Sequence, residues 1–99
     1  MEDFAKLIDE RIGKSIKERQ GNYLMVVTSV DNVRVIICFR QGHFTYYAKI
    51  VLEKDSESLN CIEAEYNPHG LYVFSNRIDD LVEKVFFKAK MLVSRLTNS

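Results

Sequence analysis

The chain has 99 residues, of which 46% are hydrophobic and 28% are charged, and its 14 Lys and Arg balance its 14 Asp and Glu. This length suits a single domain over residues 1–99 with its own core, and the four Gly and one Pro leave little irregular chain, which excludes extensive disorder. The zero net charge excludes a general attraction to nucleic acid or to an anionic membrane.

We expect neither a membrane span nor a secretion signal in this sequence. Its longest apolar runs, such as Val35 to Phe39, are about five residues long, against the roughly 20 that a spanning helix requires. The N-terminal residues form a charged amphipathic segment, which differs from a signal peptide. We therefore expect a cytoplasmic protein without a membrane partner.

The first predicted element is an amphipathic helix over residues 3–20. Its apolar residues recur at three- and four-residue spacing: Phe4, Leu7, Ile8, Ile12 and Ile16. Asp3 is a candidate N-cap, and Gly21 can end the helix in the left-handed conformation. The polar face carries both charge signs, which favours packing on the core over binding to a lipid surface.

A hairpin of two strands is predicted next, over residues 23–30 and 33–40. The second strand has apolar residues at alternate positions: Val33, Val35, Ile37 and Phe39. Asp31 and Asn32 tolerate positive φ and therefore suit a two-residue turn. Such a turn sets Val30 opposite Val33. The same register, continued along both strands, places apolar residues opposite apolar residues.

Two more strands are predicted over residues 43–54 and 59–66, with Gly42 in the first of the two turns. In this register Phe39 is expected opposite Phe44, and Ile37 opposite Tyr46.

The following turn is expected to have three or five residues, because only an odd loop keeps the apolar faces together. It sets Ile50 opposite Ile62, and Lys49 opposite Glu63 as a favourable pair of opposite charges. Residues 71–74 are expected to form a short fifth strand or an extended connection.

The last predicted element is a long helix over residues 76–97, with Ser75 or Asn76 as its N-cap. A broad apolar stripe runs along it, and Phe87 and Met91 lie outside that stripe, one turn apart. Because a helix that is apolar on a second side usually buries that side, we expect Phe87 and Met91 to form a helix interface.

The predicted fold class is α+β, a four- to five-stranded antiparallel meander sheet flanked by an N-terminal and a long C-terminal helix. Both helices are expected on one face of the sheet. The centre of the other face is also apolar and consists of Met25, Val27, Ile36, Cys38, Tyr47, Val51, Leu59 and Cys61. Since a sheet that faces only water would be more polar, either one helix crosses to this side, or a second subunit or partner covers it.

The two cysteines are expected to be reduced. In the predicted register Cys38 and Cys61 lie about 20 Å apart along the sheet. A disulfide requires Cα atoms within about 7 Å of each other. Free thiols are typical of intracellular proteins, which agrees with the expected cytoplasmic location.

No motif for catalysis, a metal or a cofactor is found. His43 and His69 lack the spacing of zinc ligands, and no Cys-x-x-Cys pair is present. Glu63 and Glu65 lie about 7 Å apart on one face of the predicted strand, but a solvated strand face explains them equally well. Without a cleft-forming loop, we predict no enzyme activity, no metal and no cofactor.

Two binding interpretations remain for the second sheet face. Its candidate binding residues are Tyr23, Met25, Arg34, Ile36, Arg40, His43, Tyr47 and Lys49. The first interpretation is a non-enzymatic interaction or structural protein that forms a homodimer, or binds another protein, through this face or through the last helix. The alternative is single-stranded nucleic-acid binding, because aromatic rings and cations can stack on bases and contact phosphates.

The predicted element order, in which antiparallel strands lie between two helices, is similar to that of small secretion chaperones. Those proteins dimerise and bind extended segments, and the resemblance rests on element order alone. A short chain without motifs is also typical of viral reading frames. In that case the expected location is the cytoplasm of the host.

Overall fold

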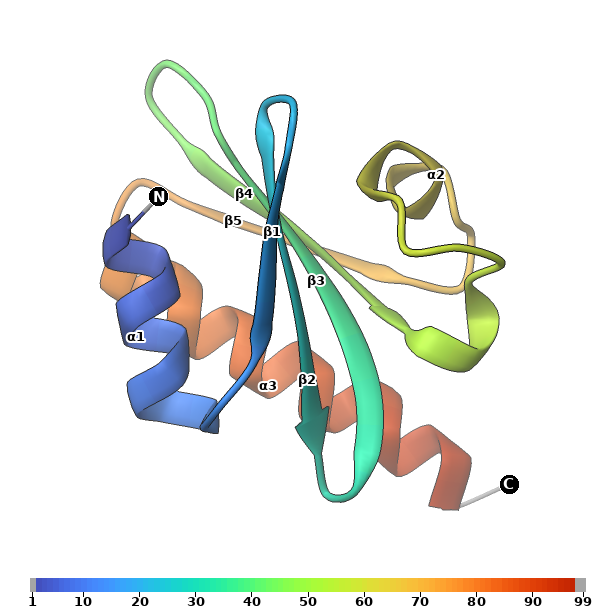
Figure 1. Cartoon of the computed structure of the whole chain (residues 1–99). Helices are drawn as coiled ribbons and strands as arrows, with labels where there is room; N and C mark the ends of the chain where they lie inside the picture. The colour runs from blue at the N-terminus through green and yellow to red at the C-terminus, as the bar shows by residue number, and fades with distance from the viewer. Residues whose placement is uncertain (1, 98–99) are drawn as a thin grey trace.

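The computed structural model describes residues 2–97, which form one twisted antiparallel sheet with the first and the last helix on one side and a short helix on the other (Figure 1). The elements in chain order are α1 (Glu2–Ile12), β1 (Ile16–Gln20), β2 (Tyr23–Val30), β3 (Val33–Gln41), β4 (Tyr46–Leu52), η1 (Glu53–Asp55), α2 (Cys61–Glu65), β5 (Leu71–Ser75) and α3 (Ile78–Thr97). The strand order β1-β2-β3-β4-β5 is that of a meander. The predicted α+β fold, with a helix at each end of an antiparallel sheet, is therefore confirmed.

The β2–β3 hairpin has the predicted register. Asp31 and Asn32 have φ angles of 51° and 67°, as a tight two-residue turn requires. Val30 pairs with Val33, and the same register continues to the pair of Tyr23 with Arg40. The side-chain chemistry of two turn residues thus determined eight cross-strand pairs.

The β3–β4 register differs from the prediction by four residues. Phe39 pairs with Ala48 rather than with Phe44, because the loop comprises residues 42–45 and Gly42 N donates a hydrogen bond to Thr45 O at 2.8 Å. An even shift leaves every side chain on its predicted face. Phe44, however, lies in the loop instead of the core and is 90% exposed.

The first helix is shorter than predicted. It ends at Ile12, and Gly13 has a φ of 115°. Residues 16–20, which were predicted to be helical, pair with β2 as the edge strand β1, and Gly21 lies in the turn between the two strands at φ 60°. Ile16 satisfied the helical spacing but is exposed on β1, so the pairing with β2 outweighed the local pattern.

The strand predicted over residues 59–66 is wrong. Asn60 caps a helix instead, since its side-chain oxygen accepts hydrogen bonds from Ile62 N and Glu63 N. The strand that pairs with β4 is β5, in which Leu71 faces Ile50 and Tyr72 faces Lys49. The predicted pairs of Ile50 with Ile62 and of Lys49 with Glu63 therefore do not form.

The main core lies between the sheet and the two long helices, as predicted. Its members include Phe4 and Ile8 of α1, the inward side chains of β2 to β5, and a continuous stripe on α3. The rings of Phe4 and Phe39 stack with centroids 4.1 Å apart. None of the helices in residues 2–97 has both the length and the hydrophobicity of a membrane span.

Candidate interaction site

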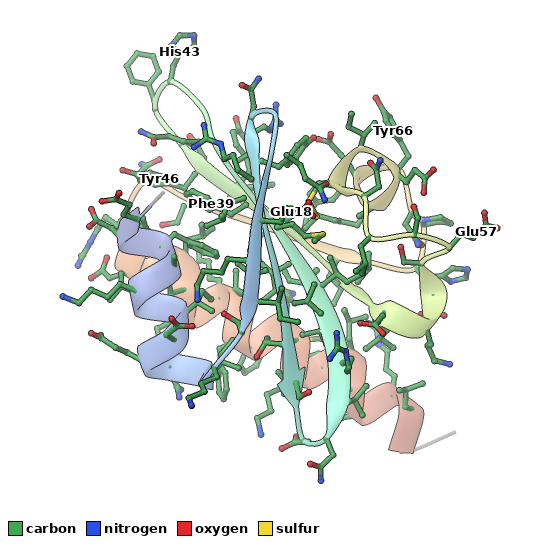
Figure 2. All side chains as sticks on the ribbon, viewed as in Figure 1. Glu18, Phe39, His43, Tyr46, Glu57 and Tyr66 are labelled. Carbon is green, nitrogen blue, oxygen red and sulfur yellow. A yellow bond between two sulfur atoms is a disulfide. The ribbon has the colours of Figure 1, made fainter. Side chains whose placement is uncertain are left out.

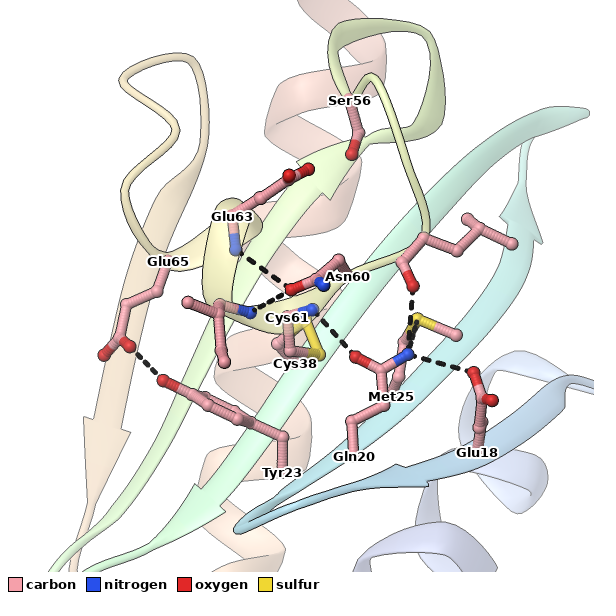
Figure 3. Close-up of a disulfide and its surroundings, with 12 residues drawn as sticks. Glu18, Gln20, Tyr23, Met25, Cys38, Ser56, Asn60, Cys61, Glu63 and Glu65 are labelled. Carbon is pink, nitrogen blue, oxygen red and sulfur yellow. Dashed lines mark hydrogen bonds between the residues drawn. A yellow bond between two sulfur atoms is a disulfide. The ribbon is translucent and has the colours of Figure 1, made fainter.

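Cys38 and Cys61 form a disulfide, with Cα atoms 5.6 Å apart (Figure 3). The prediction of reduced thiols is wrong because residue 61 begins α2, which folds back over β3 instead of continuing the sheet. Disulfides persist in oxidising compartments and in the intracellular proteins of hyperthermophiles. The cytoplasmic prediction therefore loses the support that reduced thiols gave it.

The second apolar sheet face lies beneath α2. Met25, Val27, Ile36 and Val51 form a separate core cluster there with Cys61 and Ala64 of α2. The cover that this chain itself supplies is the short helix α2, which was not predicted from the sequence, and neither of the two predicted helices crosses to this side. Met25 and Ile36 were predicted binding residues, but they are only 2% and 0% exposed.

Polar side chains of the sheet hold both ends of α2. At its start, Gln20 Nε2 donates to Leu59 O at 2.9 Å, and Gln20 Oε1 accepts from Cys61 N at 2.9 Å (Figure 3). At its end, Lys49 Nζ donates to Glu65 O at 3.0 Å and to Asn67 O at 2.8 Å. Lys49 is therefore a buried structural clamp rather than a surface cation, and burial lowers its pKa against the opposing effect of Glu65.

Next to α2, one row of side chains crosses the sheet. Neighbouring Cα partners place Gln20, Tyr23, Arg40, Tyr47 and Phe74 side by side. The Arg40 guanidinium carbon lies 5.9 Å from the ring centroid of Tyr23 and 5.0 Å from that of Tyr47. The rings of Tyr47 and Phe74 meet edge to face at 6.2 Å. We call Tyr23, Arg40, Tyr47 and Phe74 the aromatic row.

The cation of the aromatic row already has an internal partner. Glu65 of α2 accepts a hydrogen bond from the Tyr23 hydroxyl and forms an ion pair with Arg40 at 3.6 Å. Burial, and then the hydrogen bond to Glu65, raise the pKa of Tyr23 to about 12. Neutral Tyr23 is therefore the form that suits this contact.

The aromatic row ends at an open sheet edge. Among the described residues no strand pairs with the outer side of β5. Lys84 Nζ donates to Phe74 O at 3.1 Å, which places this carbonyl on the outer side. A groove of about 500 Å³ lies between this edge and α3, and its lining comprises Tyr72, Val73, Phe74, Glu83, Lys84, Phe87 and Lys88.

The two edges of the sheet differ in chemistry. The edge strand β1 carries Lys17, Glu18 and Arg19, and charged residues discourage pairing with another chain. The edge strand β5 is Leu-Tyr-Val-Phe-Ser, and Tyr72 and Phe74 are 47% and 58% exposed. Only β5 thus combines an unpaired backbone with exposed aromatic side chains.

Of the remaining predicted site residues, Arg34 and His43 lie away from the β5 edge, whereas Phe87 and Met91 lie on α3. Arg34 forms an ion pair with Glu53 at 2.8 Å, and His43 points away from the sheet at the tip of the β3–β4 loop (Figure 2). Phe87 is 65% exposed and lines the groove, while Met91 is half-buried one turn further along α3. Sequence reasoning missed Tyr72 and Phe74, although their alternation with Leu71 and Val73 was the available signal.

No group of three or more potential metal ligands occurs in the described part of the chain. The sequence matches no protein-family model, no curated protein and no solved structure. The β5 edge and the aromatic row are therefore the features of this chain from which a function can be inferred.

Proposed function

We propose that this is a non-enzymatic interaction protein that forms a homodimer by pairing β5 with the β5 strand of a second copy. The observation that carries the proposal is the contrast between the two sheet edges: β5 is open and apolar, whereas β1 is charged. Strand addition at an open edge supplies main-chain hydrogen bonds, and the adjacent groove supplies apolar contacts.

Antiparallel pairing about Val73 makes the two strands self-complementary. A twofold axis at Val73 sets Tyr72 of each copy opposite Phe74 of the other, which gives two aromatic cross-strand pairs. Each such pair contributes about 0.2–1 kcal/mol. Phe74, the last member of the aromatic row, then lies opposite Tyr72 of the second copy, whose own neighbour on β4 is Lys49.

The groove beside β5 supports the same occupant. Phe87 stands on α3 next to the open edge, so a strand added to β5 would cover part of its ring. Lys84 must release Phe74 O when the strand docks, and Asp80, whose carboxylate lies 3.2 Å from Lys84 Nζ, can retain the ammonium. Lysine at an edge also opposes indiscriminate pairing, so Lys84 limits the affinity.

Sedimentation velocity over a range of concentrations tests the proposal. The wild type is expected to reach twice the chain mass of 11.5 kDa, and Phe74→Lys is expected to weaken the dimer by about tenfold or more, because it places a charge in both aromatic pairs. Lys84→Ala is expected to strengthen it. Phe44→Lys changes an exposed aromatic residue outside β5 and should leave the dimer intact. A wild-type mass of 11.5 kDa at the highest concentration would refute the dimer.

A second candidate function, single-stranded nucleic-acid binding, is favoured by the position of Arg40 between the rings of Tyr23 and Tyr47. The ion pair of Arg40 with Glu65 and the zero net charge oppose it. Titration of DNA and RNA oligonucleotides at low salt distinguishes the two functions. Binding that weakens with salt and is lost in Arg40→Ala would support this second candidate, and no binding at low salt would remove it.

A further inference from the structure

Residues 53–70 form a cap that leaves the sheet after β4 and returns to it at β5. The cap lies over Met25, Val27, Ile36 and Val51, which form a cluster separate from the main core. Apart from the main chain at its two ends, its one covalent link to the sheet within the described residues is the disulfide between Cys38 and Cys61, whose sequence separation is 23. All other fixed points of the cap are non-covalent contacts.

We infer that this disulfide is a redox-controlled latch: its reduction releases the cap as a unit from a sheet that stays folded, and uncovers an apolar sheet face. The inference does not require the dimer, because it concerns the sheet face opposite α1 and α3 (Figure 1), although Tyr72 of β5 also donates a hydrogen bond to Glu65 O of the cap. Met25 and Ile36 become accessible only in the released state.

The non-covalent contacts of the cap are individually weaker than its disulfide. The helix α2 has five residues, and of these only Cys61 and Ala64 are buried. A helix this short is unstable alone in water. Each neutral hydrogen bond to the cap, such as those of Gln20 and of the Tyr72 hydroxyl, changes the opening equilibrium by up to about tenfold, and the hydrogen bonds of the charged Lys49 contribute more. By comparison, a disulfide that closes a loop of this size shifts the opening equilibrium toward the closed cap by about 100-fold.

The main core does not depend on the cap. This core lies on the opposite face of the sheet and includes Phe4, Phe39 and the apolar stripe of α3. Both cysteines belong to the other cluster, beneath the cap. The β2–β3 and β3–β4 pairings also lie outside residues 53–70. Release of the cap therefore leaves the helices on their face of the sheet.

The chemistry requires a dithiol reductant. One thiolate of the dithiol attacks a sulfur of the Cys38–Cys61 bond and forms a mixed disulfide, and its second thiolate displaces the remaining cysteine. The protein gains two electrons and two protons as two thiols, while the dithiol becomes a cyclic disulfide. Because both cysteines are buried, we expect slow reduction of the folded protein and fast reduction in denaturant.

Hydrogen exchange measured peptide by peptide tests the latch. The oxidised protein is compared with protein that has been reduced by dithiothreitol in denaturant and refolded in the same dithiol. We expect amides of residues 59–67 to exchange about 100-fold faster after reduction, while β2, β3 and α3 keep their protection. Binding of an anilinonaphthalene dye is expected to rise in parallel, because the apolar face is uncovered.

Variants separate the latch from a general loss of stability. The double substitution of Cys38→Ala with Cys61→Ala should reproduce the reduced pattern and no longer respond to dithiothreitol. Gln20→Ala should have little effect on the oxidised protein but should accelerate exchange in the reduced protein by up to about tenfold. Lys54→Ala, an exposed change within the cap, is the matched control.

Two results would overturn the inference. Equal loss of protection in the cap, in β3 and in α3 would mean that the disulfide stabilises the whole fold. Unchanged exchange at residues 59–67 after verified reduction would mean that the non-covalent contacts suffice to hold the cap. If the double variant fails to fold, the reduced wild-type protein still decides between these outcomes.

Discussion

Lys49 of β4 caps the end of α2 by donating a hydrogen bond to Glu65 O at 3.0 Å, and its Nζ lies 4.3 Å from the ring centroid of Tyr72. The last carbonyls of a helix have no partners within the helix, and a cation next to them is favourable. This explains why a lysine that is only 4% exposed is tolerated beneath the cap.

The first prediction follows from this contact. Lys49→Met keeps the length of the side chain but removes the donors to Glu65 O and Asn67 O. We expect a loss of about 1–3 kcal/mol in the free energy of unfolding, measured in urea. Lys54→Met, at an exposed position, should stay within about 0.5 kcal/mol of the wild type. Equal stability of the two variants would show that water replaces the lysine.

The second prediction concerns Gly70, where the cap rejoins the sheet. A Cβ atom at this position would lie 2.5 Å from Val51 Cγ1 and 2.7 Å from Ile50 O. Backbone cannot move aside as a flexible side chain can, so Gly70→Ala is expected to cost about 1–3 kcal/mol. Its neighbour His69 is exposed, and His69→Ala should cost less than about 0.5 kcal/mol. Thermal unfolding of both variants measures the difference.

The third prediction concerns the main core. Phe4 is fully buried and stacks on Phe39, so Phe4→Ala removes both apolar burial and a ring contact. We expect a loss of about 3–5 kcal/mol in guanidinium unfolding. Phe44→Ala is the matched control at a loop position and should stay within about 0.5 kcal/mol. A small loss for Phe4→Ala would mean that α1 contributes little to the fold.

The fourth prediction concerns alkaline pH. The pKa of Tyr23 is raised from 10.0 to about 12 by burial and by Glu65. The folded protein therefore holds this proton more tightly than the unfolded chain does. The resulting stabilisation is complete below pH 10 and is lost as the pH rises from 10 toward 12.

Unfolding free energies at pH 9 and pH 11 check the fourth prediction. Tyr23→Phe has no phenol to ionise, so its stability should fall less than that of the wild type between the two pH values. The stability of Tyr23→Phe should still decrease between these pH values, because the pKa of Tyr72 is also raised, with burial as the largest cause. Tyr66→Phe on the outer side of α2 should keep the wild-type dependence. An identical decrease in all three proteins would contradict the role assigned to Tyr23.

Local sequence by itself determined the β2–β3 hairpin, the two faces of the central strands and the long C-terminal helix. Asp31 and Asn32 fixed the register because a two-residue turn leaves no freedom in strand pairing. The β3–β4 loop has four residues, so alternation predicted the faces of β4 but not its partners. Phe87, which lines the groove beside β5, was identified because a helix shows its apolar sides in its periodicity.

Only the tertiary structure decided the edges and the cap. Residues 16–20 satisfy a helical spacing, yet they pair with β2, and that pairing outweighed the local preference. Asn60 with Glu63 three residues later was the signal of a helix start, but the alternation of Cys61 with its neighbours also fitted a strand. Three features depend on chain segments that are far apart in sequence: the disulfide partner of Cys61, the burial of Lys49 and the open edge of β5. No periodicity within one segment encodes such contacts.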